Sequence, residues 1–167
     1  MNAAVTVFFL ILRVFSLYFL AVSLFGLCRR RTPEPAARLR QFAVLIAARN
    51  EESCIAGLIE SLRAQHYPPE LVDIWVLPNN CTDRTAEAAR RAGAQVLEMP
   101  ASVRSKGAAL HTAAKALLRS ARNYDAFCVF DADNEADPAF LSEMNRALDR
   151  TAIVKSRILA KNRTQAG

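Results

Sequence analysis

The N-terminal 28 residues form an almost continuous apolar segment, and three arginines follow it directly. About 20 apolar residues are enough to cross the hydrocarbon core of a bilayer as a helix. The segment has no basic start and no small-residue cleavage site, which argues against a signal peptide. Arg29, Arg30 and Arg31 are typical of a stop-transfer signal on the cytoplasmic side. We therefore predict a transmembrane helix at residues 3–28, with a membrane-surface helix as the alternative.

Residues 29–41 are basic and contain Pro33 and Pro35. Proline fixes its own backbone and removes a hydrogen-bond donor, so we predict that this segment is a linker. Its arginines lie beside the apolar segment, which favours a membrane surface over nucleic acid as the partner. The net charge of +6 comes without an RNA-binding signature, so we expect no nucleic-acid binding. The predicted location is the bacterial inner or plasma membrane, with the soluble domain in the cytoplasm.

From residue 42 onward, short apolar runs alternate with amphipathic stretches of helical period. The expected strands are residues 42–47, 72–77, 95–99 and 124–130, with residues 153–159 as a further candidate. The expected helices are residues 55–62, 83–92, 105–120 and 137–148, the last with Asp137 as cap and Pro138 at its first position. Strict alternation implies an α/β fold, with a mostly parallel sheet and flanking helices. We expect this domain at residues 42–160 and a tail at residues 161–167.

Polar side chains follow three of the expected strands directly. Parallel sheets bind ligands beyond the carboxyl ends of their strands, and this rule selects residues 47–52, 78–83 and 131–134. No G-x-G-x-x-G or G-x-x-x-x-G-K-[ST] sequence occurs, which excludes the usual dinucleotide-binding and P-loop sites. The four cysteines form no C-x-x-C pair, which argues against a zinc site.

Asp131 and Asp133 come directly after the apolar run that ends at Phe130. Alternate residues of an extended chain point to the same side, so the two carboxylates can converge on one point. Hard oxygen ligands suit Mg²⁺ or Mn²⁺, which also bind phosphate oxygens. A calcium-binding EF-hand loop is excluded, because its glycine and glutamate positions hold Ala136 and Ser142 here. Two solvated acids in a loop are the alternative interpretation of this pair.

Four segments, in this order and spacing, resemble those of family 2 glycosyltransferases, which include cellulose, chitin and hyaluronan synthases. They are Ala47–Glu52 (AARNEE), Asn79–Thr85 (NNCTDRT), Ser105–Leu110 (SKGAAL) and Phe130–Asp133 (FDAD). The resemblance covers about residues 42–159. It implies a GT-A fold, which is Rossmann-like, for the soluble domain.

The resemblance also implies a donor-binding role for residues at this edge of the sheet. Those implied for the nucleotide-sugar are Ala47, Arg49, Asn50, Glu51, Asn79, Lys106 and Asp131, and those implied for the metal are Asp131 and Asp133. The turn after the first strand would cradle base and ribose, and Lys106 would sit near the diphosphate. Asn79 stands where the family usually has an acid, although an amide oxygen can still accept from a uracil N–H. The implied cofactor is Mg²⁺ or Mn²⁺.

The implied function is that of a membrane-anchored glycosyltransferase with a nucleotide-sugar donor. The expected donor is a UDP-sugar, and the expected group is hexosyl or N-acetylhexosaminyl. Family members use a later acid as general base, and no carboxylate follows Asp149 in this chain. We therefore expect a C-terminally truncated chain, with the acceptor site supplied either by a partner chain or by further sequence.

Two other functions stay open at this point. The first is a catalytically inactive remnant that binds the nucleotide-sugar but lacks the general base and the acceptor site. The second is a nucleotidyltransferase, which shares the alternating architecture. Those enzymes typically carry a glycine-rich loop after the first strand, whereas this chain has Ala-Ala-Arg-Asn-Glu-Glu there.

Overall fold

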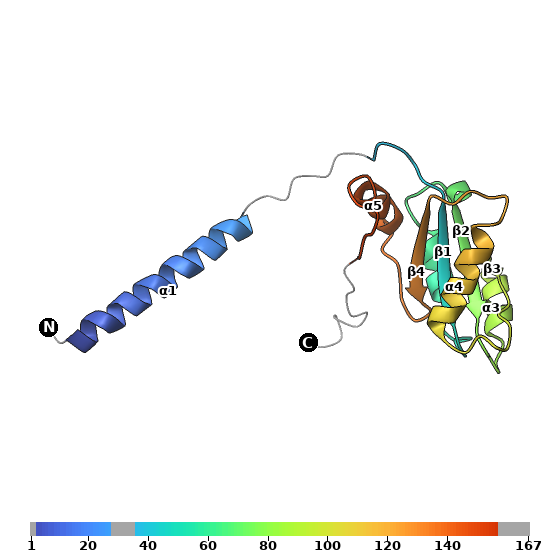
Figure 1. The fold of residues 1–167 in the computed structure, drawn as a ribbon, viewed down its shortest axis with the longest axis horizontal. Coiled ribbons are helices and arrows are strands. Elements are labelled where there is room, and N and C mark those ends of the chain that lie inside the picture. Colours follow the sequence, from blue (N-terminus) through green and yellow to red (C-terminus); the bar gives the residue numbers. More distant parts are fainter. Residues whose placement is uncertain (1–2, 28–35, 157–167) are drawn as a thin grey trace. The chain divides into compact units, whose positions relative to one another are not determined.

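The computed structural model describes residues 3–27 and 36–156, which belong to two separate units of the chain (Figure 1). The first unit holds one helix, α1 (Ala3–Leu27). Its residues Val5–Leu24 are long and apolar enough to cross a membrane, with a mean hydropathy of 2.3. None of that window is buried, so apolar side chains are exposed all around the helix. A helix therefore forms where the sequence predicts one, and Cys28 lies outside the described residues.

The second unit is an α/β domain built on a four-stranded sheet with the order β3-β2-β1-β4. All of its strand pairings are parallel. The strands are β1 (Phe42–Ala48), β2 (Val72–Pro78), β3 (Gln95–Val96) and β4 (Ala126–Asp131). The predicted fold class is confirmed.

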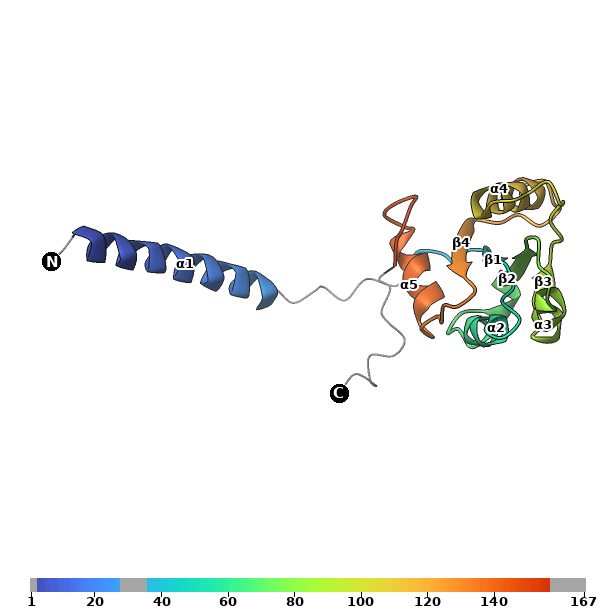
Figure 2. The ribbon, with the colours of Figure 1, turned by 90° about the horizontal axis from the view of Figure 1, so that it is seen from below.

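Helices cover both faces of this sheet, as Figure 2 shows. One face packs against α2 (Ile55–Arg63) and α3 (Thr85–Arg91), and the other packs against α4 (Lys106–Leu117). A short 3-10 helix, η1 (Pro69–Leu71), precedes β2, and α5 (Phe140–Ala147) packs beside β4. This layering leaves the two ends of the sheet open for loops.

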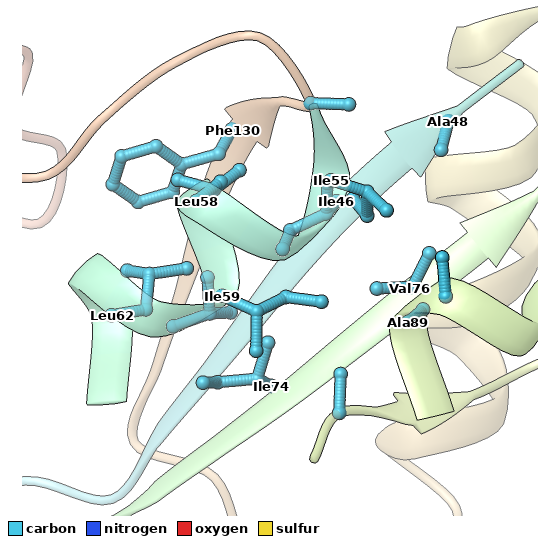
Figure 3. Close-up of a cluster of buried hydrophobic side chains, with 14 of the residues drawn as sticks. Ile46, Ala48, Ile55, Leu58, Ile59, Leu62, Ile74, Val76, Ala89 and Phe130 are labelled. Carbon is cyan, nitrogen blue, oxygen red and sulfur yellow. The ribbon is translucent and has the colours of Figure 1, made fainter. Parts of the chain in front are cut away.

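The core centres on β1, because both of its faces are covered. The side chains from Phe42 to Ile46 are at most 2% exposed, as expected for a continuous apolar strand. On one face Ile46 lies in the cluster that contains Ile59 of α2 (Figure 3). On the other face Leu45 packs with Ala113 of α4. Each fully buried side chain of this size contributes about 1.5–3 kcal/mol.

Local capping signals set two helix boundaries. The Ser105 hydroxyl accepts a hydrogen bond from the backbone N–H of Ala108 at 3.1 Å, and α4 begins at the next residue. Gly93 adopts a left-handed backbone with φ 91 just after α3, which ends that helix as predicted. Gly93 therefore supplies a conformation that a residue with a Cβ atom adopts only with strain.

The predicted elements differ most from the structure at the last helix, at the third strand and at the candidate strand of residues 153–159. The last helix begins at Phe140, because the Asp137 carboxylate accepts from Ala139 N–H at 2.8 Å and forms a turn before the helix. The third strand keeps only Gln95–Val96, since it pairs with β2 alone at the edge of the sheet. Residues 153–156 form no strand, and residues 157–159 lie outside the described part of the chain.

The described end of the predicted linker is tied to the domain. Its residues 36–41 form neither helix nor strand. The Arg40 guanidinium contacts the Asn145 carbonyl at 2.9 Å and the Asp149 carboxylate at 2.9 Å. The Tyr67 hydroxyl donates to the Arg40 carbonyl at 2.9 Å. Residues 29–35 and the predicted tail lie outside the described residues.

Candidate functional site

Three loops meet at the carboxyl edge of the sheet, where β1, β2 and β4 end. The register places Ala47 of β1 level with Leu77 of β2 and Asp131 of β4. The backbone N–H of Asn79 then donates to the Ala48 carbonyl at 3.0 Å. The polar segments selected from the sequence therefore follow neighbouring strands at one edge of the domain.

The loop after β1 is locked to the loop after β2. The Asn50 side-chain oxygen accepts a hydrogen bond from the backbone N–H of Thr82 at 2.8 Å. Asn50 has φ 57, a left-handed conformation that asparagine tolerates better than most residues. The backbone N–H of Glu51 donates to the Thr85 hydroxyl at 2.9 Å. Asn50 and Glu51, both predicted site residues, are thus held in place by the second loop.

Asp83 completes this connection. Its carboxylate accepts from the backbone N–H groups of Glu52 and Thr85, each at 3.1 Å, and from the Thr85 hydroxyl. The Thr85 hydroxyl is the main reason that the pKa of Asp83 lies below its ordinary value, and the backbone donors add to the effect. The T-D-x-T segment was predicted from its resemblance to the family motif, and this structural role was not predicted. The signal was present, because Asp and Thr just before a helix are typical of side chains that bond to backbone N–H groups.

Asn79 is buried at the end of β2, with 6% of its surface exposed. Its side-chain oxygen accepts from the Asn80 amide at 2.7 Å, and that amide also donates to the Val103 carbonyl at 2.8 Å. Asn80 has φ 52 and so provides the second left-handed turn of the site. An amide oxygen has two lone pairs, so Asn79 retains capacity for one more donor.

Asp131 and Lys106 contact each other across the edge. Asp131 is the last residue of β4, and Lys106 is the first residue of α4. The Lys106 ammonium forms an ion pair with one carboxylate oxygen of Asp131. Both side chains are about half exposed, at 46% and 59%. The structure therefore brings together two residues that the sequence analysis singled out separately.

Asp133 lies on the exposed turn after β4, and its charge acts on Cys54, which follows the first loop. The Cys54 thiol donates to the Glu51 carboxylate at 3.0 Å. The pKa of Cys54 is raised to about 11, first by burial, then by Glu51, with the negative charge of Asp133 adding to the effect. Asp133 and Glu51 thus contribute negative charge to the same side of the site, around a thiol that stays protonated at neutral pH.

Asp131 and Asp133 are suited to a divalent metal whose remaining ligands come from a bound phosphate. Among the described residues, no group of three or more His, Cys, Asp and Glu side chains could hold an ion by itself. Mg²⁺-type sites commonly use only one or two carboxylates and complete the shell with phosphate oxygens and water. Asp131 and Asp133 match that pattern, and a cation, the Lys106 ammonium, already contacts Asp131.

Two predicted site residues stand apart from this network. Ala47 is half-buried within β1, and Arg49 is exposed just beyond it. Within residues 36–156, Arg49 has no ion pair. Both lie at the correct edge of the sheet, and their predicted contacts to a nucleotide stay predictions.

A cavity of about 330 Å³ lies near the start of β2, away from these loops. Asp73, which helps to line it, is buried and accepts from the Tyr124 hydroxyl at 2.8 Å. The Arg122 guanidinium lies 2.6 Å from the same carboxylate. The charge of Asp73 is therefore already compensated, and we place the functional site at the carboxyl edge.

Comparison with known proteins identifies the sequence family of the domain. The sequence model described as "Glycosyl transferase family 2" matches residues 43–165. The chain is 36% identical over 45 residues to the beta-monoglucosyldiacylglycerol synthase of Synechocystis sp., which spans 27% of this chain and 9% of that protein. It is 28% identical over 108 residues to "Probable glycosyltransferase YdaM" of Bacillus subtilis, which spans 60% of this chain and 24% of that protein. The chain thus spans a quarter or less of these relatives.

Solved structures agree on the fold. The mannosyltransferase PcManGT from Pyrobaculum calidifontis, solved with GDP-Man and Mn²⁺, has a TM-score of 0.62 and 21% identity, over 79% of this chain and 39% of that chain. Residues 1–349 of S. aureus TarS have a TM-score of 0.55 and 21% identity, over 65% of this chain and 32% of that chain. The narrower likeness to cellulose, chitin and hyaluronan synthases stays a prediction. The match over residues 43–165 shows that the chain belongs to glycosyl transferase family 2.

Proposed function

We propose that the carboxyl edge of the sheet binds a nucleotide-sugar donor together with a divalent metal, for glycosyl transfer. The observation that carries this proposal is the contact between Lys106 and Asp131, beside two loops that are locked to each other. A cation and a carboxylate at this point can hold a diphosphate and its metal. The Pyrobaculum mannosyltransferase, solved with GDP-Man and Mn²⁺, supports the ligand class.

The carboxylates, the lysine and the first loop would have different roles in the proposed site. Asp131 and Asp133 would hold Mg²⁺ or Mn²⁺, which supplies charge neutralisation of the diphosphate leaving group. Lys106 would add a positive charge near that diphosphate. The turn that contains Asn50 and Glu51 would cradle the base and ribose, and its bonds to the second loop fix its shape before the ligand arrives.

The expected donor is a UDP-sugar that carries a hexosyl or N-acetylhexosaminyl group. The free lone pair of Asn79 is suited to the N–H of uracil. TarS, which shares the fold, has been solved with UDP. Burial of Asn79 fixes the direction of that oxygen, so an aspartate is not required at this position.

The proposed location is a bacterial inner or plasma membrane, with α1 as anchor and the domain on the cytoplasmic side. The apolar window Val5–Leu24 supports the anchor, since none of this window is buried within the structure. We propose that the acceptor site and the general base are supplied outside the described residues, by a partner chain or by further sequence. Two of the sequence relatives are named as synthases of a glucosylated diacylglycerol, which makes a lipid acceptor the first to test.

The test is ligand binding and turnover by the detergent-solubilised full chain. Titration with UDP should show binding in the presence of Mn²⁺ and none after EDTA. Incubation with radiolabelled UDP-glucose and diacylglycerol then separates an active transferase, which yields a labelled lipid, from an inactive binding remnant. UDP binding that is equally strong without metal would contradict the proposed site.

A further inference from the structure

The Lys106–Asp131 contact places a positive charge where the proposed metal would bind. Asp131 is fixed by the sheet, because it pairs in register with Ala47 of β1. Lys106 is fixed at its backbone, because it is the first residue of a helix that Ser105 caps. The ammonium reaches the carboxylate oxygen from this neighbouring element. A metal ion that binds the same oxygen must first displace it.

The exposure of the pair makes this displacement easy. Both side chains are about half exposed, and exposed ion pairs contribute at most about a factor of five to an equilibrium. The lysine side chain is long and flexible, so its ammonium can leave Asp131 without a movement of the backbone. A nearby diphosphate would offer it several negative oxygens in exchange.

We infer that Lys106 occupies the metal position at Asp131 in the ligand-free chain, so that metal and nucleotide bind together and not metal first. This inference rests on the proposed function. Metal alone meets a carboxylate that is already neutralised by Lys106. Metal that arrives with a diphosphate brings the negative charge that draws the ammonium away from Asp131.

Asp133 is a second carboxylate, and it stays available to a metal while Lys106 contacts Asp131. Within residues 36–156 the structure gives Asp133 no ion pair. A single exposed carboxylate holds a divalent ion weakly, because such ions require several oxygen ligands. The ligand-free site therefore offers the metal one carboxylate, and the nucleotide-loaded site offers it two together with phosphate oxygens.

The consequence is a pair of effects with opposite signs. Lys106→Met should tighten the binding of Mn²⁺ alone by about three- to five-fold, because it frees Asp131 and removes a nearby positive charge. The same variant should weaken the binding of UDP in saturating Mn²⁺ by a similar factor, because the diphosphate loses a cation. If Lys106 contacted only the diphosphate, its substitution would weaken UDP binding and leave the affinity for Mn²⁺ alone unchanged.

The experiment is a Mn²⁺ titration of the full chain without nucleotide. Electron paramagnetic resonance measures the concentration of free Mn²⁺ at each point. The matched control is Lys115→Met, which removes the same charge from an exposed position of α4. The Mn²⁺ binding measured for the Asp131→Asn, Asp133→Asn double variant is subtracted, because it reports binding elsewhere on the chain. We expect Lys106→Met to tighten Mn²⁺ binding and Lys115→Met to match the wild type.

The outcomes separate this inference from the proposed function. If Lys106→Met binds Mn²⁺ alone no more tightly than the wild type, the inference about Lys106 is overturned. The proposed function still stands in that case, provided that the wild type binds UDP in a metal-dependent way. UDP binding by the wild type that does not need Mn²⁺, or that the double aspartate variant retains, overturns the proposed function instead. Equal tightening by Lys115→Met would show a general charge effect and would also overturn the inference.

Discussion

A charged side chain is mostly buried at one end of the sheet, and a charged pair is half exposed at the other. At the amino end, the Arg40 side chain is only 12% exposed and contacts two backbone carbonyls and Asp149. At the carboxyl end, Lys106 and Asp131 are about half exposed and contact each other. Compensated, buried charges stabilise a fold, whereas exposed charges that can exchange partners are available to a ligand. We therefore expect substitution of Arg40 to change stability, and substitution of Lys106 or Asp131 to change binding.

The largest expected effect is on binding, from Asp131→Asn combined with Asp133→Asn. Loss of both carboxylates should weaken Mn²⁺-dependent UDP binding by about 100-fold or more, since each metal–carboxylate contact is removed. Both side chains are exposed, so the free energy of unfolding should change by less than about 0.5 kcal/mol. Calorimetric titration and urea unfolding of the same preparation measure the two quantities. Unfolding of the variant would break the contrast between the two ends.

The next effect is on stability, from Arg40→Met. The substitution keeps the apolar stem but removes hydrogen bonds to the Asn145 and Leu148 carbonyls. We expect a loss of about 2 kcal/mol in the free energy of unfolding, because buried acceptors lose a charged donor. UDP affinity should stay at the wild-type value, measured by the same titration. A loss of affinity with unchanged stability would reverse the assignment of the two ends.

Asn50 lies between these extremes, since it shapes the binding edge through structure. Asn50→Ala removes the acceptor for Thr82 N–H and puts at φ 57 a residue that tolerates the left-handed conformation less well than asparagine, which together should cost about 1–2 kcal/mol of stability. Asn50→Gly is the matched control, because it also lacks the acceptor but tolerates this φ. The glycine variant should therefore be more stable than the alanine variant by about 1 kcal/mol. Equal stability of the two variants in thermal unfolding would show that backbone strain at this position is unimportant.

The smallest effect is a pH dependence from Asp83. Its pKa is lowered in the folded chain, chiefly by the Thr85 hydroxyl, so its contribution to stability is complete above the ordinary Asp pKa of about 3.9. That contribution is lost as the pH falls through the lower folded value. Asp83→Asn should flatten the acid limb of the stability profile and leave its shape above about pH 5 unchanged. An unchanged acid limb in urea unfolding from pH 2 to 6 would contradict the role of this hydrogen bond.

The sequence was sufficient to predict the fold and to select the polar segments that the structure places at one edge of the sheet. Continuous apolar strands such as β1 and periodic helices such as α2 are local signals, and strict alternation fixes a parallel sheet. The structure confirms that arrangement and brings the predicted residues Lys106 and Asp131 into contact. Those two lie in separate motifs 25 positions apart, so their contact depends on how α4 packs on the sheet.

Interactions that depend on three-dimensional approach could not be read from the sequence. The bonds from the Asp83 region to the first loop link residues about 30 positions apart, and no local pattern predicts such pairs. The predictions of the third strand and of the helix start at Asp137 were wrong for a different reason. A strand at the sheet edge and a helix start both depend on competing local hydrogen bonds, which pattern rules do not weigh.

The most direct test of the central claim is where a bound metal lies in the domain. Mn²⁺ with UDP should be added to the ¹⁵N-labelled full chain in detergent, with Mg²⁺ and UDP as the diamagnetic reference. A seven-residue strand such as β1 is about 20 Å long, so the two ends of the sheet are far enough apart to resolve. Backbone signals of Asn50, Thr82 and Asp133 should disappear first, while those of Arg40 and Asn145 persist. Loss of the Arg40 and Asn145 signals first would contradict the account.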